Sequence, residues 1–533
     1  MRKYSNISSG ATIARGVLIL FSSKIMGLLL GLLQFLLVAH AFGMGLVTDA
    51  YIVAQTIPRF SRGIVEGGLN STFLPVLVEH RGKNGEYEAW KIIRTIFFIS
   101  AVILIIFSLL TIFFAPQISF ILAPGFSPES LNLSSYLLRI MSPMLLLIFL
   151  SLLLSAVFHS YNNFFVPSMA ALLPQAGGII ALVIFADSMG IVSLPLGIIV
   201  ATIMQLLLLL FFLRKYKPGE KSHISLNHAG VKQIGRLIGP RFLGFSLDGM
   251  NLFVDRLFAS LLGSGLVSAL TFAQTIVRIP HNFVAGSLGR AMMPTLSLHS
   301  INKEYDDIKK LLSKSIRMIS FVTIPVIIFT AIFREDLIRL LFQRGAFTAE
   351  STHLTAYALL FYSFSVFAYS VNPVLKIVFY AMQDTVTPLK VGIMAIVSNA
   401  ILDYVLMKFM GHGGIALATS IVATFNTAAL WYCLSGKIGA IDKSLIFRSM
   451  LRTFLISFSI GFFLKVIYPY LHIGKYGFFW DSAGMTCLLI IGGVLFWGSC
   501  IFFNIKEYRE IMDMAQNRRG NKNSKIKREI LAD

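Results

Sequence analysis

The sequence is poor in cysteine and in charge. Its 533 residues include three cysteines, all inside apolar stretches and none in a C-x-x-C pair. This excludes a disulfide framework and gives no sign of a zinc site. Charged residues make up 13% of the chain, whereas an average soluble protein carries about 25%. A soluble globular protein is therefore excluded.

Catalytic and nucleotide-binding motifs are also missing. The segments GEKSH (219–223) and SGKIG (436–440) lack the spacing of a phosphate-binding P-loop. The chain has no H-E-x-x-H or G-x-S-x-G motif, and no carboxylate pair beside a nucleophile. We therefore expect no enzyme and no cofactor beyond a coupling ion. Any uphill transport must draw on an ion gradient or on the membrane potential.

Apolar sequence is abundant instead. Hydrophobic residues make up 56% of the chain, and the mean hydropathy is +0.76. Apolar runs long enough to cross a bilayer recur from Val17 to Phe503. We predict an all-α, multi-pass membrane protein with about fourteen transmembrane helices. They are expected at 14–42, 47–78, 92–114, 133–160, 166–187, 190–213, 234–262, 267–298, 314–333, 354–381, 388–408, 412–435, 447–466 and 480–503.

Positive charge is concentrated in alternate connections between these helices. The chain has 46 Lys and Arg against 25 Asp and Glu, a formal net charge of +21. If the N-terminus is inside, most Lys and Arg fall in inner loops and at the two ends. The positive-inside rule then predicts that both termini are cytoplasmic. The surplus suits orientation and anionic lipid headgroups, so no nucleic-acid partner is expected.

One segment occurs twice along the chain. FGMGLVTDAYIVAQTIPRF (42–60) and LGSGLVSALTFAQTIVRIP (262–280) share G-x-G-L-V followed by A-Q-T-I. An internal repeat in a membrane protein indicates two homologous lobes, with the substrate bound at their seam. The helices that carry the two copies run in the same sense, so we predict parallel repeats.

These observations predict five regions. They are a first six-helix lobe at 1–213, a basic cytoplasmic linker at 214–233, a second six-helix lobe at 234–435, two additional helices at 436–503 and a basic cytoplasmic tail at 504–533.

Four cations lie deep in predicted helices, where a charge costs on the order of 2.5–3.5 kcal/mol. They are Lys24, Arg59, Arg62 and Arg278. Arg59 and Arg62 are three residues apart and share a helix face. The set predicts a cationic cavity for an anionic substrate, because the arginine fork matches phosphate oxygens. The alternative for Arg62 is that Glu66, one turn away, neutralises it.

A second polar group lies near the outer ends of other helices. Asp255, Asn399, Asp403 and Thr419 have similar predicted depth, and Asn399 and Asp403 are four residues apart on one face. Their oxygen atoms suit a small hard cation. The alternative is that Asp255 pairs with Arg256 while Asp403 reaches water.

Further stretches carry a more specific pattern. They are FGMGLVTDAY with EGGLNSTFLPVL (42–77), LLRIMSPMLLLIFLSLLLSAVFHSYNNFFVP (137–167), VDRLFASLLGSGLVSAL (254–270), LLFQRGAFTAESTHLTAYAL (340–359), and FYAMQDTVTPLKVGI (379–393) followed by GHGGIALATS (411–420). Together they resemble the MurJ (MviN) family of bacterial lipid II flippases, within the multidrug/oligosaccharidyl-lipid/polysaccharide exporter superfamily. The resemblance runs essentially from end to end.

The resemblance implies the substrate and the location. The substrate would be lipid II, the undecaprenyl-diphosphate-linked peptidoglycan precursor, moved from the cytoplasmic to the periplasmic leaflet of the inner membrane by alternating access. It implies twelve core helices plus two that form a lipid-accessible groove. Lipid II and membrane lipids are the expected partners, and a monomer is the expected state.

The resemblance also implies roles for single residues. Lys24 stands where the family usually has an arginine, and Arg62 matches a cavity arginine. A further cavity arginine of the family falls at Thr275, while Arg278 takes a usually acidic position. Residues implied to support the cavity are Asp49, Glu66 and Thr275, and those implied to bind sodium are Asp255, Asn399, Asp403 and Thr419.

Other functions stay open at this point. The chain could flip another lipid-linked oligosaccharide, or export small molecules in exchange for a cation. A membrane enzyme such as a lipid-phosphate transferase would need clustered catalytic residues at one membrane face, and none is found.

Overall fold

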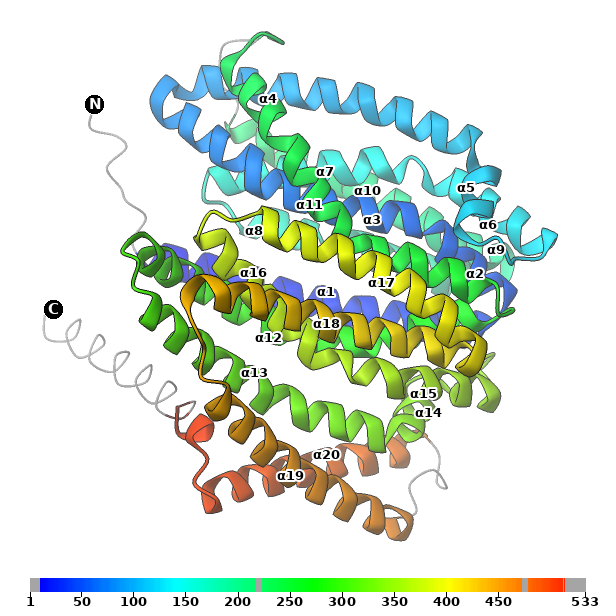
Figure 1. Cartoon of the computed structure of the whole chain (residues 1–533). Helices are drawn as coiled ribbons and strands as arrows, with labels where there is room; N and C mark the ends of the chain where they lie inside the picture. Colours follow the sequence, from blue (N-terminus) through cyan, green and yellow to red (C-terminus); the bar gives the residue numbers. More distant parts are fainter. Residues whose placement is uncertain (1–9, 217–222, 472–477, 511, 513–533) are drawn as a thin grey trace, which may run out of the picture. The chain divides into compact units, whose positions relative to one another are not determined.

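The computed structural model describes residues 10–216, 223–471, 478–510 and 512 (Figure 1), and all regular structure in these ranges is helical. In chain order the helices are α1 (Gly10–Phe42), α2 (Leu46–Ala54), α3 (Thr56–Gly68), the π-helix η1 (Leu69–Phe73), α4 (Leu74–Phe113), α5 (Ala115–Leu122), α6 (Pro128–Met141), α7 (Met144–Ser160), α8 (Phe165–Ala170), α9 (Leu173–Met189), η2 (Gly190–Val192), α10 (Ser193–Leu213), η3 (Arg214–Tyr216) and α11 (Ala229–Ser260). They continue with α12 (Leu266–Ile301), α13 (Tyr305–Ile332), α14 (Arg334–Phe342), α15 (Ala349–Ser363), α16 (Ser365–Ala381), α17 (Val386–Met410), α18 (His412–Ile438), α19 (Lys443–Ile467), η4 (Tyr468–Leu471) and α20 (Phe478–Phe502).

Each of the fourteen predicted segments is helical, which confirms the all-α class. Within the described residues, nine stretches are long and apolar enough to cross a membrane, or ten if the bent pair α15 and α16 forms one span. Two of these stretches, Leu46–Phe113 and Phe165–Tyr216, each contain two predicted segments. Helices α11 and α12 are not among them, because charged and polar residues interrupt their sequences. The number of crossings stays a prediction.

The helix predicted at 47–78 is not continuous. It divides into α2, α3, η1 and the start of α4, with a break at Gln55. The first copy of the repeat has one more residue than the second between G-x-G-L-V and A-Q-T-I. It also has Pro58, which offers no N–H to the carbonyl four residues earlier. The second copy lacks both features and forms one helix, α12.

The connection expected around 80–94 contains a single break, at Gly85, and is helical on both sides of it, so it is shorter than predicted. Helix α4 runs through it, and only Gly85 departs from helical geometry, with φ of 85°. Glycine adopts this left-handed region without a steric penalty, which lets the chain turn between two helical segments.

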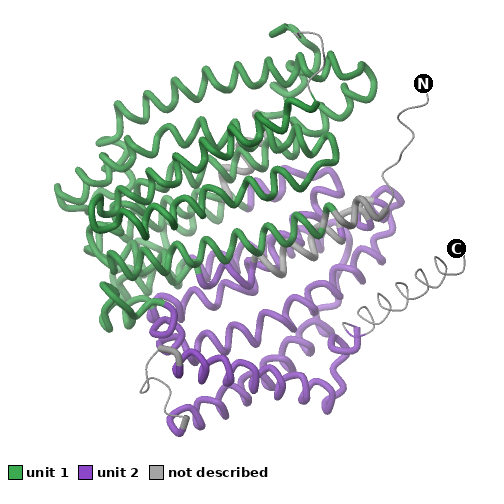
Figure 2. Tube along the Cα trace, turned by 180° about the vertical axis from the view of Figure 1, so that it is seen from behind, with its two compact units in different colours: residues 1–275, 342–355, 392–418 green, residues 276–341, 356–391, 419–533 purple. Residues whose placement is uncertain are grey.

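The chain forms two compact units, coloured in Figure 2. Unit 1 comprises residues 1–275, 342–355 and 392–418, and unit 2 comprises residues 276–341, 356–391 and 419–533. Unit 1 has an apolar core that includes Phe73, Trp90 and Phe158, from η1, α4 and α7. Unit 2 has a core in which α12, α13, α16 and α18 contribute residues such as Leu312 and Phe379. The division into lobes at 213 and 234 stays a prediction.

Two turns, one in each unit, share a backbone geometry that the sequence repeat did not reveal. Asn162 follows α7 with φ of 56°, and Gln383 follows α16 with φ of 60°. The next residue in each turn is a short polar one, Asn163 or Asp384, whose side chain accepts a hydrogen bond from a backbone N–H three residues on. Each therefore caps the helix that follows.

Each capping residue is also tied to the end of a later helix. The Asn163 side chain donates to the Tyr216 hydroxyl at 3.2 Å, just after α10. Asp384 accepts from the Lys437 ammonium at 2.5 Å, near the end of α18. The same number of positions separates Asn163 from Asp384 and Tyr216 from Lys437. The internal repeat therefore extends to these contacts, neutral in one unit and charged in the other.

Candidate functional site

The two copies of the repeat meet through one buried carboxylate in unit 1. Asp49 on α2 is 1% exposed. Its Oδ1 accepts from the Ser268 backbone N–H at 2.7 Å, and its Oδ2 from the Gly265 N–H at 2.5 Å. The Ser268 hydroxyl also contacts Oδ1. Asp49 thus caps the start of α12, where a negative charge is favoured by the helix dipole.

This contact is asymmetric. The residue equivalent to Asp49 in the second copy is Ala269, which has no group to return the contact. The prediction that Asp49 supports a cavity stays a prediction, and the structure assigns it this capping contact.

Three of the predicted cations lie in unit 1. Lys24 is exposed on α1, while Arg59 and Arg62 are half-buried on α3. The Arg59 guanidinium lies 5.5 Å from the centre of the Phe35 ring of α1. Within the described residues, Glu66 forms no ion pair with Arg62 and is exposed. The proposed neutralisation of Arg62 is therefore not seen.

The fourth cation lies in unit 2. Arg278 is exposed on α12. Counted from A-Q-T-I, it occupies the same place in the second copy as Arg59 in the first. The Thr275 hydroxyl donates to the Thr271 carbonyl at 2.8 Å, a bond within its own helix. A cavity that gathers cations from both units stays a prediction.

Buried neutral polar residues in unit 1 were missed in the sequence. Gln55, at the break between α2 and α3, donates from Nε2 to the Tyr51 hydroxyl at 2.9 Å. Its buried Oε1 accepts no hydrogen bond within the described part of the chain, and the same holds for Oε1 of Gln175 and Oδ1 of Asn251. The repeat was the available signal for Gln55, because both copies carry a glutamine at this position, Gln55 in the first and Gln274 in the second. A glutamine has no charge, whereas the predicted sites were found from their charged residues.

Three of the four residues of the second polar group lie together. Asn399 on α17 donates from Nδ2 to Asp255 Oδ1 on α11 and to Asp403 Oδ2, each at 2.8 Å. Asp403 is 0% exposed, so the alternative that it reaches water is wrong. Thr419 is buried on α18 in unit 2, whereas the other three belong to unit 1. Its place in the group stays a prediction.

This cluster fits a small cation. Oδ1 of Asn399 and Oδ1 of Asp403 are buried, and neither accepts a hydrogen bond from a described residue. Two carboxylates this close cannot both stay ionised in a buried site unless a positive charge or a shared proton offsets them. The donor set is oxygen only, which suits Na⁺ better than a transition metal.

An apolar cavity of about 270 Å³ lies between α13, α19 and α20 in unit 2. Its lining is almost entirely hydrophobic, and glycines on α19 and α20 leave room for it. Lining residues include Pro325, Phe329, Ile460, Gly461, Gly492, Phe496 and Trp497. The cavity suits a hydrocarbon chain.

Polar contacts hold α19 and the segment after α20 in place. Arg317 on α13 donates to Glu507 at 2.6 Å, and Ser449 of α19 donates to the same Glu507 oxygen at 2.9 Å. The Tyr468 hydroxyl, just after α19, donates to Asp336 of α14 at 2.6 Å. Helices α13, α19 and α20 run near one another in Figure 1.

Comparison with known proteins identifies the family. A family model described as lipid II flippase MurJ matches residues 38–481. The chain belongs to the MurJ family. A probable lipid II flippase MurJ of Buchnera aphidicola (subsp. Schizaphis graminum) is 30% identical over 486 residues, which is 89% of this chain and 94% of the relative. The lipid II flippase MurJ of Burkholderia cenocepacia is 28% identical over 75% of this chain and 80% of its own length.

Solved structures agree on the fold. A structure described as lipid II flippase MurJ in an inward closed conformation has a TM-score of 0.76 at 24% identity, covering 93% of this chain and 100% of that chain. An inward-facing multidrug transporter of the MATE family has a TM-score of 0.66 at 14% identity, covering 80% of this chain and 99% of that one. The chain is therefore a multi-pass inner-membrane protein of a flippase family, as predicted.

Proposed function

We propose that the chain moves lipid II from the cytoplasmic to the periplasmic leaflet by alternating access of its two lobes. The proposal rests on two half-buried arginines of α3, Arg59 and Arg62. It also rests on the match of the lipid II flippase family model to residues 38–481. Half-buried guanidinium groups in a membrane helix are costly unless they serve a ligand or a water-filled space. The proposed ligand is the diphosphate of lipid II.

Recognition would rest on the geometry of the arginine fork. Arg62 has no acidic partner among the described residues, so its N–H donors can bind two phosphate oxygens at once. Arg59, stacked near Phe35, has a restricted orientation that reduces the entropy lost on binding. Lys24 and Arg278 would add charge without the same geometric demand. Glu66 and Thr275 would line the same space.

We propose that Asp255, Asn399 and Asp403 couple transport to a cation, with Thr419 as a further oxygen donor. Bound Na⁺ would add positive charge beside the two carboxylates. Asn399 holds both carboxylates through its Nδ2 and leaves its Oδ1 turned to accept a cation. A shared proton is the alternative, and the source of energy would then be the proton gradient or the membrane potential.

The undecaprenyl chain needs an apolar path beside the polar one. The cavity between α13, α19 and α20 offers hydrocarbon and aromatic side chains with almost no polar surface. We propose that it holds part of the lipid tail while the headgroup crosses. We further propose a monomer, oriented with both termini in the cytoplasm, that transports without chemical change to its substrate.

The test is complementation in a bacterium depleted of its own lipid II flippase, with lipid II in the outer leaflet as the readout. The wild-type chain should restore lipid II export, and the Arg62→Ala/Arg278→Ala double variant should lose it. Arg448→Ala is the matched control, because Arg448 is exposed at the start of α19 and lies outside the proposed cavity.

Membrane expression of every variant is measured in parallel. Normal expression without rescue by the wild type would point to another lipid-linked oligosaccharide or to a small-molecule exporter. Rescue by the double variant would disprove the cationic site while leaving the flippase function in place.

A further inference from the structure

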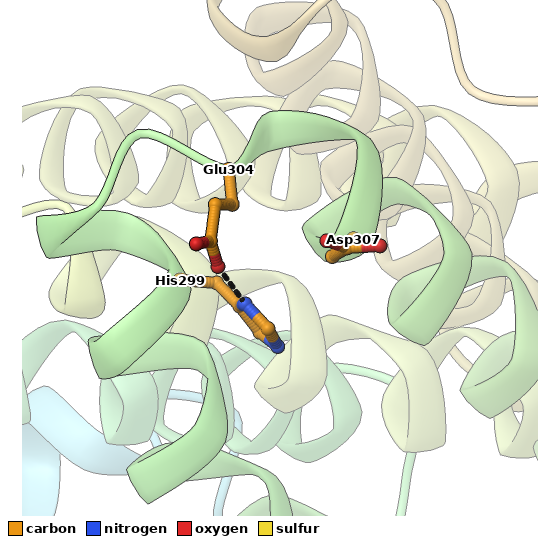
Figure 3. Close-up of side chains that lie close together, drawn as sticks. All are labelled: His299, Glu304 and Asp307. Carbon is orange, nitrogen blue, oxygen red and sulfur yellow. Dashed lines mark hydrogen bonds and ion pairs between the residues drawn. The ribbon is translucent and has the colours of Figure 1, made fainter.

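A mixed histidine and carboxylate cluster lies at the connection between α12 and α13 (Figure 3). His299 is in the last turn of α12, Glu304 precedes α13, and Asp307 is in the first turn of α13. One ligand atom from each lies within 4.8 Å of the other two. The Nδ1 atom of His299 is 2.5 Å from Oε2 of Glu304. All three residues belong to unit 2.

The local backbone brings these side chains together. Lys303 adopts a left-handed conformation with φ of 57°, and the Glu304 N–H donates to the His299 carbonyl at 2.9 Å. This closes the end of α12 and starts α13 immediately afterwards. The three side chains therefore lie close together, with Asp307 to one side of the hydrogen-bonded pair of His299 and Glu304 (Figure 3).

The donor set points to a class of ligand. One imidazole nitrogen with two carboxylate oxygens is typical of borderline divalent ions such as Zn²⁺, Co²⁺ and Mn²⁺. His299 is partly buried, while the Glu304 and Asp307 side chains are 43% and 48% exposed. An ion held here could complete its coordination with water.

We propose that His299, Glu304 and Asp307 bind a divalent transition-metal ion, with Zn²⁺ as the probe. The bound ion replaces the direct hydrogen bond between His299 and Glu304 and links the end of α12 to the start of α13. Neither the substrate nor the direction of transport enters the proposal, so it stands apart from the proposed function.

Existing contacts do not block such a site. Asp307 forms an ion pair with Lys310, with 3.0 Å between Oδ1 and Nζ, but the Lys310 side chain is 78% exposed. An exposed pair of this kind contributes little to stability and is easily replaced. The adjacent Asp306 pairs with Lys309 in the same way and is not part of the cluster. Replacing Asp306 therefore tests whether loss of any acidic charge here weakens metal binding, or only loss of a residue of the cluster.

The experiment uses the full chain, purified in detergent without a histidine tag and freed of metal with a chelator. Zn²⁺ is titrated by calorimetry, and Co²⁺ binding is followed by its visible absorption. We expect one saturable site, weakened at least tenfold in His299→Ala and in Asp307→Asn. Asp306→Asn should bind like the wild type.

All four residues concerned are at least partly exposed, so the variants should fold, and their metal-free melting curves test this. Absence of a saturable site in the wild type would overturn the proposal. So would equal Zn²⁺ affinity in wild type, His299→Ala and Asp307→Asn, since the ion would then bind other histidines among the ten in the chain.

Discussion

The Oδ1 atom of Asp49 lies 2.7 Å from the backbone nitrogen of Ser268, so one residue of the first repeat copy caps a helix that begins in the second. The sequence places these two residues more than 200 positions apart. The contact depends on a carboxylate that only one copy has.

Replacing Asp49 should destabilise the protein. In Asp49→Ala, the Gly265 and Ser268 N–H groups lose their buried acceptor, which should cost about 2 kcal/mol or more. Thermal unfolding in detergent, monitored by tryptophan fluorescence, measures the loss. Asp187→Ala is the control, because Asp187 is an exposed carboxylate on α9 without a described partner. Equal melting temperatures for the two variants would show that the Asp49 cap does not stabilise the protein.

Sodium should stabilise the wild-type protein if the acidic cluster binds it. We expect a higher melting temperature in NaCl than in KCl at equal ionic strength, since a ligand that binds only the folded state stabilises it by mass action. Asp403→Asn should abolish this difference. In sodium-free buffer the same variant should be at least as stable as the wild type, because it removes one of two like charges.

Other outcomes of this experiment would point to a proton in place of Na⁺, or to no coupling ion at this cluster. If NaCl and KCl act alike on the wild type while the pH dependence of its stability changes in Asp403→Asn, the cluster holds a proton. If neither property changes in Asp403→Asn, the cluster has no coupling role.

The contact between Arg317 and Glu507 should behave as a buried ion pair. Arg317→Met leaves Glu507, 4% exposed, with a buried charge that, among the described residues, only Ser449 contacts. Breaking such a pair typically costs about 3–5 kcal/mol. The double variant Arg317→Met/Glu507→Leu removes both charges and should recover much of the loss. The melting temperatures of the single and double variants test this prediction. If the double variant is less stable than Arg317→Met, the two residues do not act as a buried ion pair.

The turn at Asp384 predicts an acid-dependent contribution to stability. Burial raises the pKa of Asp384, but hydrogen bonds from Lys437 and Thr387 outweigh it and lower the pKa from 3.8 to about 2. A carboxyl with a lowered pKa in the folded state stabilises the protein fully above its unfolded pKa. This stabilisation should therefore be lost as the pH falls from 3.8 towards about 2.

Asp384→Asn gives the second turn the amide found at Asn163 in the first. The wild type should be more stable than this variant at neutral pH, and the difference should shrink across that acid range. Asp442→Asn at the start of α19 is the comparison, because it changes a capping aspartate that has no ion pair with a lysine among the described residues. If the stability difference between the wild type and Asp384→Asn does not change with pH, the charge of Asp384 does not contribute to stability through Lys437.

Much of the fold could be predicted because hydropathy and helix length act locally. All fourteen predicted segments are helical, and Asp255, Asn399 and Asp403 do meet. Helix breaks were harder. The interruption at Gln55 depends on one additional residue and on Pro58, and the helical connection around Gly85 lacks the apolar run that marked the other helices. The missed polar residues, such as Gln55, carry no charge to mark them in an apolar segment.

The sequence by itself determined the membrane class, the helical content, the repeat and the family. Each follows from local composition or from a motif, which need no knowledge of distant contacts. Only the tertiary structure decided which polar groups are paired, such as Asp49 with the start of α12 and Arg317 with Glu507. It also showed that Asp403 is shielded from water. These outcomes depend on which helices pack together, and packing joins residues whose separation along the chain carries no information about their distance in space.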